Sequence, residues 1–581
     1  MAERYPTDAV PDRPAIGVSV DGQALDPEVV RDVMEVDVHE EINRHARLSL
    51  LVHNWDSDRR QVRYSDQGPF APGRAIAVSM GYHAELTQVF SGVISALEGH
   101  FSSASGATLQ VEARSKSILL SGLPRSRLFE QTTDGDIAQS IAVDYSLSAK
   151  ADTGATRETV VQDRRTDWEA LVERAEMIGW VTYVRDDDLV FRPPARPTGD
   201  EPELSWGKNL SEIHLIEDVS RLGDPVKAAG WDPEQQAIAD ADADAARGEV
   251  SDGGRATATD AVGNTGWPSR TTLLHAPLPL TSEELDRLAV GRVNRQELEH
   301  INGYGTTVGL PVLRIDSWLK VTGVGDRIGG AHYLTAVRHR VGPNGFQTEF
   351  RMGLAPALVP PPVRGREAGG HLRLGVVEDL DDPLGWGRVK VKFPWRTDAQ
   401  DPVWARVATL DAGPKQGTWF IPDVGQEVAV GFVEGDDGQP LVVGSLWNGQ
   451  QGVPEAIDPD KNDIRSIVTR SGHRLRFDDG DGKSVTLETA AGRRVVLDDD
   501  GKKVTLMDSG SNNTVELSDD GITLTAAKGD ITLKAGSGKV KLDASGIDAK
   551  STGPAKIESS ATAELKASAT LTLSGALVKL N

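Results

Sequence analysis

The chain has 581 residues, a formal net charge of −24 and no cysteine. This length exceeds what one hydrophobic core can organise and predicts three or four domains. The acidic balance argues against a nucleic-acid binder, which needs a basic surface, and the missing cysteine excludes disulfides, thiolate zinc sites and cysteine nucleophiles. With 60 glycines, 31 prolines and 5% aromatic residues, the composition favours a mainly β protein with many short strands.

Residues 1–17 combine charged residues with prolines and lack the apolar core of a signal peptide. The sequence also holds no run of about 18 apolar residues, the minimum for a membrane-spanning helix. We therefore expect the chain to be made in the cytoplasm without a signal peptide.

The first predicted unit, residues 1–233, alternates strand patterns with helix patterns. The clearest helix begins at Thr166, whose hydroxyl can cap the amide of Glu169 while the Glu169 carboxylate reaches back. Gly179 suits the end of this helix. Strands are predicted in three stretches: 33–38, 48–52 and 89–97.

Residues 234–263 hold few large apolar side chains, so burial cannot offset the entropy of ordering them. We expect a flexible linker rich in Ala and Asp there, with a solvated loop or a contact to a partner or cargo protein as its two possible roles. A helix over 282–299 and four strands then follow, and the strands on both sides of the linker are expected to form one hub. The four strands are predicted at 312–315, 318–324, 332–339 and 346–352.

A Pro/Gly-rich stretch at 356–370 predicts a linker between domains. Residues 371–450 hold five of the twelve tryptophans among short β-rich runs. This pattern predicts a closed barrel of about five strands whose interior is plugged by large residues.

The C-terminal region repeats a pair of apolar residues, x-Val/Ile-x-Leu-x, with a period near eight residues. Each repeat predicts a strand of about three to five residues with one buried face and a Gly, Ser or Asp turn. Two apolar side chains per repeat cannot build an interior from one chain, so we expect several chains to wind around a common axis. The pairs begin at Val485/Leu487 and continue through Val495/Leu497, Val504/Leu506, Val515/Leu517, Ile522/Leu524, Ile531/Leu533 and Val540/Leu542 to Val578/Leu580.

Residues 417–448, GTWFIPDVGQEVAVGFVEGDDGQPLVVGSLWN, resemble the signature of the VgrG and phage baseplate hub family. TRSGHRLRFDDGDG at 469–482 resembles the collar that introduces the spike in that family. TDWEALVERAEMIGWVTYVRDDDLVF and GGAHYLTAVRHRVGPNGFQTEFRM resemble parts of its hub. The resemblance therefore covers nearly the whole chain in family order.

The resemblance implies a homotrimer with a hub of β-barrel domains and small helices, an OB-fold neck and a C-terminal needle that is an intertwined triple-stranded β-helix. It implies a structural spike and hub of a contractile injection system that joins an inner-tube (Hcp-like) protein and the baseplate to the membrane-puncturing tip. A PAAR-type tip protein, effector cargo and mechanical contact with a target membrane would follow. The expected division of the chain is 1–233 hub, 234–263 linker, 264–355 hub, 356–370 linker, 371–450 OB barrel, 451–482 collar and 483–581 spike.

Two sets of contact residues are predicted from this arrangement. The apolar C-terminal end would bind the tip protein through Leu577, Val578, Leu580 and Asn581. The neck would be packed, in its core or between subunits, by Trp419, Phe420, Val424, Val428, Phe432 and Trp447.

No catalytic, cofactor or metal site is predicted, and few residues separate Trp447 from the collar, too few for an inserted enzyme. His332 and His339 are seven residues apart in strand-like sequence, which places them on opposite faces and disfavours a metal site. The Asp clusters near 478 and 498 could bind calcium, although wet turns explain them more simply, and the neck tryptophans could bind sugar. The competing functions are a hub-associated polysaccharide- or peptidoglycan-degrading enzyme and a trimeric receptor-binding fibre.

Overall fold

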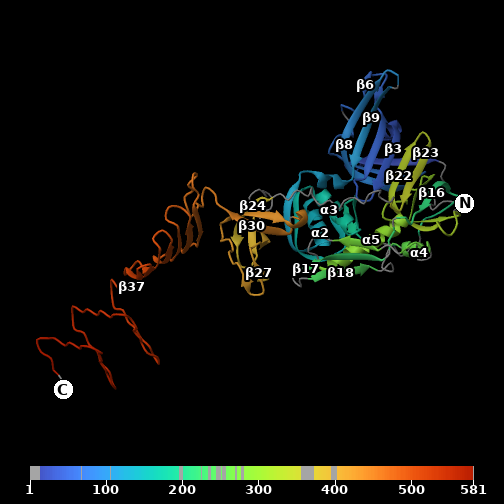
Figure 1. Cartoon of the computed structure of the whole chain (residues 1–581). Coiled ribbons are helices and arrows are strands. Elements are labelled where there is room, and N and C mark those ends of the chain that lie inside the picture. The colour runs from blue at the N-terminus through green and yellow to red at the C-terminus, as the bar shows by residue number, and fades with distance from the viewer. Residues whose placement is uncertain are drawn as a thin grey trace. The chain divides into compact units, whose positions relative to one another are not determined.

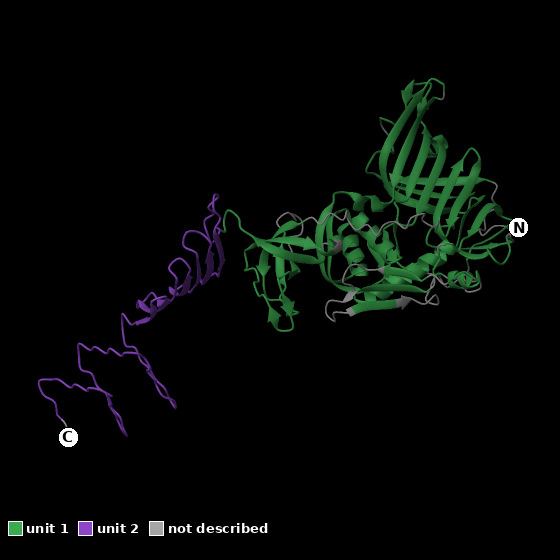
Figure 2. Cartoon of the chain, in the orientation of Figure 1, with its two compact units in different colours: residues 1–451 green, residues 452–581 purple. Residues whose placement is uncertain are grey.

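The computed structural model describes residues 1–581 except 1–12, 67, 105, 195, 197–200, 221, 224, 233–236, 244–249, 251–256, 269–270, 276–280, 355–371, 394–401, 437 and 580–581. The predicted linker at 356–370 and Trp395 therefore lie outside the described residues. The chain divides into two compact units, residues 1–451 and residues 452–581 (Figure 2). None of the helices in the described part of the chain is long and apolar enough to cross a membrane.

The first unit is organised by a 13-stranded sheet in which a block of strands from residues 203–352 pairs with a block from residues 14–114 (Figure 1). Its path begins β16-β20-β23-β22 and continues β3-β4-β9-β8-β7-β1-β2, with β15 and β21 attached to the side of β22. The strands are β1 (Pro14–Val20), β2 (Gln23–Ala24), β3 (Val33–Glu41), β4 (Arg47–His53), β7 (Ala75–Tyr82), β8 (Glu85–Ser102), β9 (Gly106–Arg114), β15 (Glu203–Ser205), β16 (Leu210–Glu217), β20 (Ile301–Val308), β21 (Trp318–Thr322), β22 (Gly330–Gly342) and β23 (Gly345–Met352).

The long strand β22 connects the two halves of this sheet because it pairs with β3 on one side and with β23 on the other. Strands from both sides of residues 234–263 therefore pair within one continuous sheet. Among the described residues, the strands that close into a barrel are those near the end of this unit. The stretch 312–315 was predicted as a strand, and this is wrong, since it forms turns that lead into β21.

Smaller sheets and helices accompany the large sheet. Helix α3 carries the predicted capping box, in which Thr166 accepts from the amide of Glu169 and Glu169 accepts from the amide of Thr166. Apolar residues of α2 and α3 share one core with residues of β13 and β14. These elements are α1 (Pro27–Asp32), β5 (Trp55–Asp56), β6 (Gln61–Val62), β10 (Arg125–Thr133), α2 (Asp134–Asp144), β11 (Ser148–Ala151), β12 (Thr156–Arg165), α3 (Asp167–Met177), β13 (Val181–Arg185) and β14 (Asp188–Arg192).

The predicted linker 234–263 differs from the expected flexible connection, because two of its stretches form regular structure. Ala237–Ala243 is strand β18, and Ala258–Gly263 is helix α4. β18 pairs with β17 (Val226–Asp232), which also pairs with β19 (Thr272–His275). The small side chains of Ala239 and Ala241 pack against the core formed with helix α5 (Ser282–His300), so a strand without large residues is still anchored.

The end of the first unit is a closed five-stranded barrel, as predicted for the neck. Its interior is filled by small and medium residues, mainly valines: Val377, Val389, Val391, Phe393, Val403, Ala405, Val428, Val430 and Val442. The barrel strands are β24 (Arg373–Asp379), β25 (Val389–Lys392), β26 (Val403–Val407), β29 (Glu427–Phe432) and β30 (Pro440–Leu446). Between β26 and β29, the chain forms a short hairpin of β27 (Ala412–Gly413) and β28 (Gln416–Gly417).

The second unit contains a seven-stranded antiparallel sheet in which each strand pairs with the next one in sequence. It joins strands of the predicted collar with strands of the predicted spike. The strands are β31 (Ile464–Val468), β32 (Arg474–Asp478), β33 (Ser484–Glu488), β34 (Arg493–Asp498), β35 (Lys503–Asp508), β36 (Asn513–Ser518) and β37 (Gly521–Thr525).

Candidate assembly surfaces

The apolar pairs of the repeat lie on one face of the sheet β31–β37. In the register of β33 and β34, Val485 is opposite Leu497 and Leu487 is opposite Val495. At every later pair of strands a valine again faces a leucine, or an isoleucine in β37. These residues therefore form two columns that cross the strands, and valine and leucine alternate along each column. One column contains Phe477, Val485, Leu497, Val504, Leu517 and Ile522, and the other contains Leu475, Leu487, Val495, Leu506, Val515 and Leu524.

This apolar face is open in the single chain. Leu487 is 58% exposed and Leu497 is 47% exposed, although a strand with this alternation normally buries its apolar side. The sheet is hollowed along the second column, where Leu487, Leu506 and Leu524 line a cavity of about 740 Å³. A contiguous apolar surface of this kind marks a contact with another chain.

The ladder of this sheet differs from the expectation of interleaved chains. Within β31–β37, the hydrogen-bonded neighbours of every strand come from the same chain. Short turns make this possible, such as the one at Asp498, whose Oδ1 accepts from the amide of Gly501 at 2.7 Å. Within this sheet the backbone groups between neighbouring strands are hydrogen-bonded, but the apolar face is left exposed to solvent.

Residues 526–579 behave differently, because they contain no strand paired within the chain. Their repeat continues nevertheless, and its apolar residues are exposed, for example Leu533 at 66% and Leu565 at 65%. Extended backbone without ladder partners needs hydrogen bonds from elsewhere. Within its described residues, this segment therefore has no ladder partners, and apolar side chains of its repeat are exposed.

The predicted tip-binding residues lie at the end of this segment. Leu577 and Val578 are exposed, at 73% and 49%, and Leu580 and Asn581 lie outside the described residues.

The predicted neck residues fall into two groups. Val428 is fully buried in the barrel, and Phe432 packs against the barrel core. The other four lie on the surface of the single chain, outside the barrel interior, which leaves the contact between subunits as the role expected for them. They are Trp419, Phe420, Val424 and Trp447, and each is between 58% and 75% exposed.

The barrel interior is occupied by other side chains, namely seven valines with Ala405 and Phe393. Leu410, at 95% exposure, joins the exposed apolar residues of the neck. The neck therefore also carries an apolar surface suited to a neighbouring chain.

The barrel is fastened to the two-stranded sheet β10–β12 by two arginines that the sequence did not single out. Arg373 on β24 forms an ion pair of 3.1 Å with the buried Asp163, and Arg388 donates to Glu158 at 3.1 Å. Arg388 also donates through Nε to Asp382 at 2.9 Å. Burial alone would raise the pKa of Asp382, but hydrogen bonds from the amides of Arg388 and Leu384 and from the Arg388 guanidinium outweigh it and lower that pKa.

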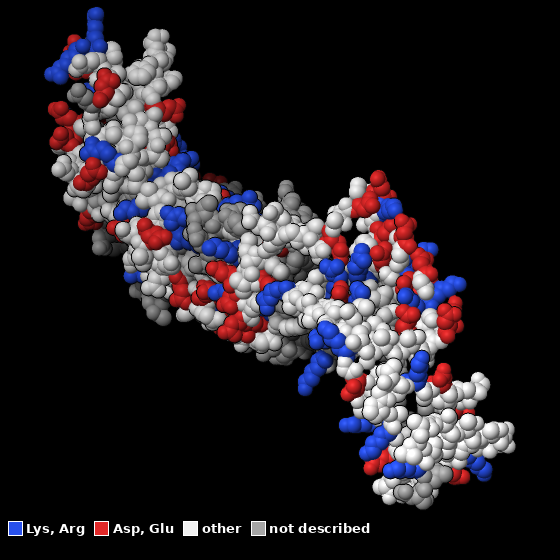
Figure 3. Space-filling view, turned by 90° about the vertical axis from the view of Figure 1, so that its left-hand side faces the viewer, with Lys and Arg blue, Asp and Glu red and all other residues white. Residues whose placement is uncertain are grey.

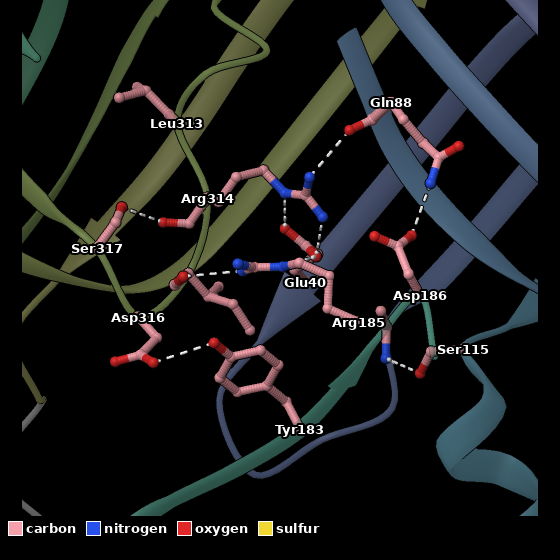
Figure 4. Close-up of polar contacts among 12 residues, drawn as sticks. Glu40, Gln88, Ser115, Tyr183, Arg185, Asp186, Leu313, Arg314, Asp316 and Ser317 are labelled. Carbon is pink, nitrogen blue, oxygen red and sulfur yellow. Dashed lines mark hydrogen bonds and ion pairs between the residues drawn. The ribbon is translucent and has the colours of Figure 1, made fainter. Parts of the chain in front are cut away.

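A buried polar network holds the loop between β20 and β21 in the hub (Figure 4). Arg314 in this loop donates to both oxygens of Glu40 on β3, at 2.7 and 2.8 Å, and to the carbonyl of Gln88 on β8 at 3.0 Å. Arg185 donates to the carbonyl of Ile315, and Tyr183 donates to Asp316. The network thus joins the sheet, the hairpin β13–β14 and the loop.

The two histidines of β22 do not form a metal site. His339 is fully buried between the hydroxyl of Thr348, 2.9 Å from Nδ1, and the carbonyl of Leu313, 3.0 Å from Nε2. His332 instead lies 3.1 Å from the carbonyl of Ile328 through Nε2. Among the described residues, no group of three His, Asp or Glu side chains is placed to hold a metal ion. Burial lowers the pKa of His339 to about 4.

On the face drawn in Figure 3, basic and acidic side chains are interspersed, and no continuous basic stripe of the kind that follows a nucleic acid is visible.

Comparison with known families matches two parts of the chain. Residues 11–342 match the family described as the Alg8 N-terminal domain. Residues 373–447 match the type VI secretion system/phage-baseplate injector OB domain, which is the barrel described above.

Relatives of known name are similar over a short stretch. The type VI secretion system spike protein VgrG2a of Pseudomonas aeruginosa is 39% identical over 103 residues, which is 16% of this chain and 12% of that protein. VgrG5 of the same organism is 38% identical over 109 residues, or 17% of this chain and 14% of the relative. The chain thus aligns with about an eighth of the length of these relatives.

Among solved structures, a chain of the Francisella PdpA-VgrG complex in its half-lidded form has a TM-score of 0.52 at 10% sequence identity. The alignment covers 90% of this chain and 90% of that chain. At this identity the similarity concerns the fold, and it extends over nearly all of both molecules.

Proposed function

Because this chain belongs to the family of the Alg8 N-terminal domain and is a VgrG-like baseplate spike protein with an injector OB domain, we propose that it is the structural hub and spike of a contractile injection system. In this function it joins the inner tube and the baseplate to the tip that pierces a membrane. The observation that carries the proposal is the open apolar face of β31–β37, followed by the strandless repeat of residues 526–579.

The working form would be a homotrimer. Three copies of β31–β37 would face one another and bury the two apolar columns in a common dry axis. Residues 526–579 would then wind around the copies from the other two chains, which would supply the missing ladder partners. The exposed neck residues, Trp419 and Trp447 among them, would lie between subunits.

A rod built in this way suits mechanical penetration. Strands stack about 4.8 Å apart, so the seven strands of the sheet alone span about 30 Å along the ladder. Hydrogen bonds along the ladder and a packed centre would resist bending under axial load. The chain would act by stiffness, with no catalytic step.

The ends of the assembly would bind different partners. The hub would dock on an inner-tube protein of the Hcp type and on baseplate proteins, and effectors could travel with it. The exposed end near Leu577 and Val578 would bind a tip protein of the PAAR type, because open strand edges need a cap. The assembled particle would carry the chain outward on contraction.

A mass measurement on the purified full chain by multi-angle light scattering tests this proposal. The expected result is three times the chain mass of 62.3 kDa, independent of loading concentration. A monomer or a dimer would overturn it.

A further inference from the structure

The polar face of the hub sheet carries a hollow of about 790 Å³ that the proposed function does not use. It lies over β20, β23, β22, β3, β4 and β9. Five arginines line it: Arg44, Arg47, Arg114, Arg338 and Arg351. Only Glu41 and Glu349 bring carboxylates to its lining, which leaves a surplus of three positive charges in a chain of net charge −24. We call it the arginine hollow.

Three of the five arginines, with His39 between two of them, stand in one row across four strands. Arg338 is opposite His39, His39 is opposite Arg47, and Arg47 is opposite Arg114. Residues directly opposite on antiparallel strands have their Cβ atoms about 5 Å apart, and like charges in such positions destabilise the sheet. The hub therefore carries an electrostatic cost in this row.

Neighbouring carboxylates offset part of that cost. Arg338 contacts Asp37 and lies 3.6 Å from Glu349, and Arg114 lies 3.2 Å from Glu112. Within the described ranges, Arg47 has no carboxylate at ion-pair distance, and its side chain is exposed. The middle of the row thus holds an accessible guanidinium between a histidine and a second arginine.

Burial is the main cause that lowers the pKa of the two histidines at the hollow. For His39, the charges of Arg47 and Arg338 add to this lowering, and those of Glu41 and Asp37 oppose it. The pKa of His45, at the edge of the hollow, is lowered to about 4 by burial and by Arg114. A bound anion would relieve this positive field.

We propose that the arginine hollow binds carboxylate side chains of an acidic peptide segment from a partner protein. Charge complementarity favours an anion, and bidentate contacts with carboxylates suit guanidinium groups. The two carboxylates in the lining favour a peptide over a nucleic acid as the ligand, because Glu41 and Glu349 would repel the evenly spaced phosphates of a nucleic acid. A peptide can place an uncharged residue at those positions, and the half-exposed ring of Tyr304 at the rim offers it an aromatic contact.

The test is fluorescence anisotropy of a labelled peptide in which pairs of aspartates are separated by glycines, titrated with the full-length protein. Binding should saturate at one peptide per chain and weaken as salt is added. Arg47→Glu should weaken binding by at least about tenfold, as expected when one partner of a close charge pair is reversed. Arg59→Glu is the matched control, since it changes net charge equally at an exposed site outside the hollow.

Thermal unfolding of Arg47→Glu shows whether weaker peptide binding comes from the lost arginine or from a damaged fold. Glu at position 47 would stand opposite His39 and Arg114, so Arg47→Glu should keep or raise the unfolding midpoint without peptide. A lower midpoint would overturn the like-charge argument. Absence of saturation, an equal loss with Arg59→Glu, or stronger competition by a single-stranded oligonucleotide of equal charge would each overturn the proposal. These results do not depend on whether the chain is a trimer.

Discussion

The guanidinium of Arg314 and the carboxylate of Glu40, 274 residues apart in the chain, form two hydrogen bonds of 2.7 and 2.8 Å inside the hub. Glu40 is 5% exposed, and its pKa is lowered because the hydrogen bonds and charge of Arg314 outweigh the effect of burial. The pair connects a strand from the first half of the hub with a loop from the second half. Each charge depends on the other to remain buried.

Removal of one partner should therefore destabilise the hub strongly. Glu40→Ala leaves the Arg314 guanidinium buried without its carboxylate and should lower the free energy of unfolding by about 3 kcal/mol. Chemical denaturation followed by tryptophan fluorescence measures this change. Arg340→Gln is the control, because its pair with Glu35 is more exposed and should change the same quantity by less than about 1 kcal/mol. Equal effects of the two variants would contradict the prediction.

Acid should weaken the hub through His339. The folded state holds this histidine neutral with a pKa of about 4, below its ordinary 6.5, so between these values the unfolded chain binds a proton that the folded chain does not. This contribution is fully present above pH 6.5 and is lost as the pH falls, with a slope of about 1.4 kcal/mol per pH unit. His339→Gln should remove that slope from denaturation curves measured between pH 7 and pH 5. His53→Gln, an exposed histidine on β4, should leave the slope unchanged.

The apolar face of the sheet β31–β37 should control assembly of the proposed trimer. Leu487→Glu combined with Leu506→Glu places two carboxylates in the second apolar column and should convert the trimer to monomers in sedimentation velocity. Thr486→Glu with Thr505→Glu makes the same chemical change on the opposite face of β33 and β35 and should leave the trimer intact. Loss of the trimer in both double variants would argue against the face-specific contact.

The neck offers a comparison between an exposed and a buried position. Trp419→Ala should raise the dissociation constant of the trimer by at least about tenfold, since large aromatic residues dominate contacts between chains. Val428→Ala should instead lower the free energy of unfolding by about 2 kcal/mol by leaving a cavity in the barrel. A concentration series in the analytical ultracentrifuge and thermal unfolding measure the two effects. An unchanged dissociation constant for Trp419→Ala would place that indole outside the subunit contact.

The end of the repeat should carry the tip. Deletion of residues 571–581 removes the last apolar pairs and should abolish binding of a PAAR-type tip protein in a pull-down, while light scattering still finds a trimer. A single substitution, Leu577→Ser, should reduce tip binding without shortening the rod. Tip binding that survives the deletion would show that the contact lies elsewhere.

Much of the fold was predictable where local pattern and tertiary packing agree. Thr166 and Glu169 formed the capping box expected from their spacing, and the apolar pairs from Val485 to Leu524 occupy one face of successive strands. In both cases the neighbours that stabilise the element are close in sequence, so the pattern contains the information.

The misses arose where small residues or chain geometry decide the structure. Ala and Asp alternate with a period of two over Ala237–Ala243, which is a strand pattern, but attention to large apolar residues hid it. The packing of Ala239 beside helix α5 supplies the burial that the composition does not suggest. The sequence left two positions open for Trp419, the barrel core or a contact between subunits, because it does not show that valines, Ala405 and Phe393 occupy the interior. The row from Arg338 to Arg114 needed the register of four strands, which no local pattern contains.

The pairing of β31–β37 only with neighbours in sequence has a consequence for how such a protein can change over time. A deletion or duplication that covers two consecutive strands with their turns, such as β33 and β34, leaves the direction of the chain and the side that each leucine faces unaltered. Loss of a single strand would instead reverse the path of everything that follows. The length of the rod can therefore change by two strands at a time, through duplication or deletion of the corresponding gene segment. Such a change leaves the hub and the neck unaltered.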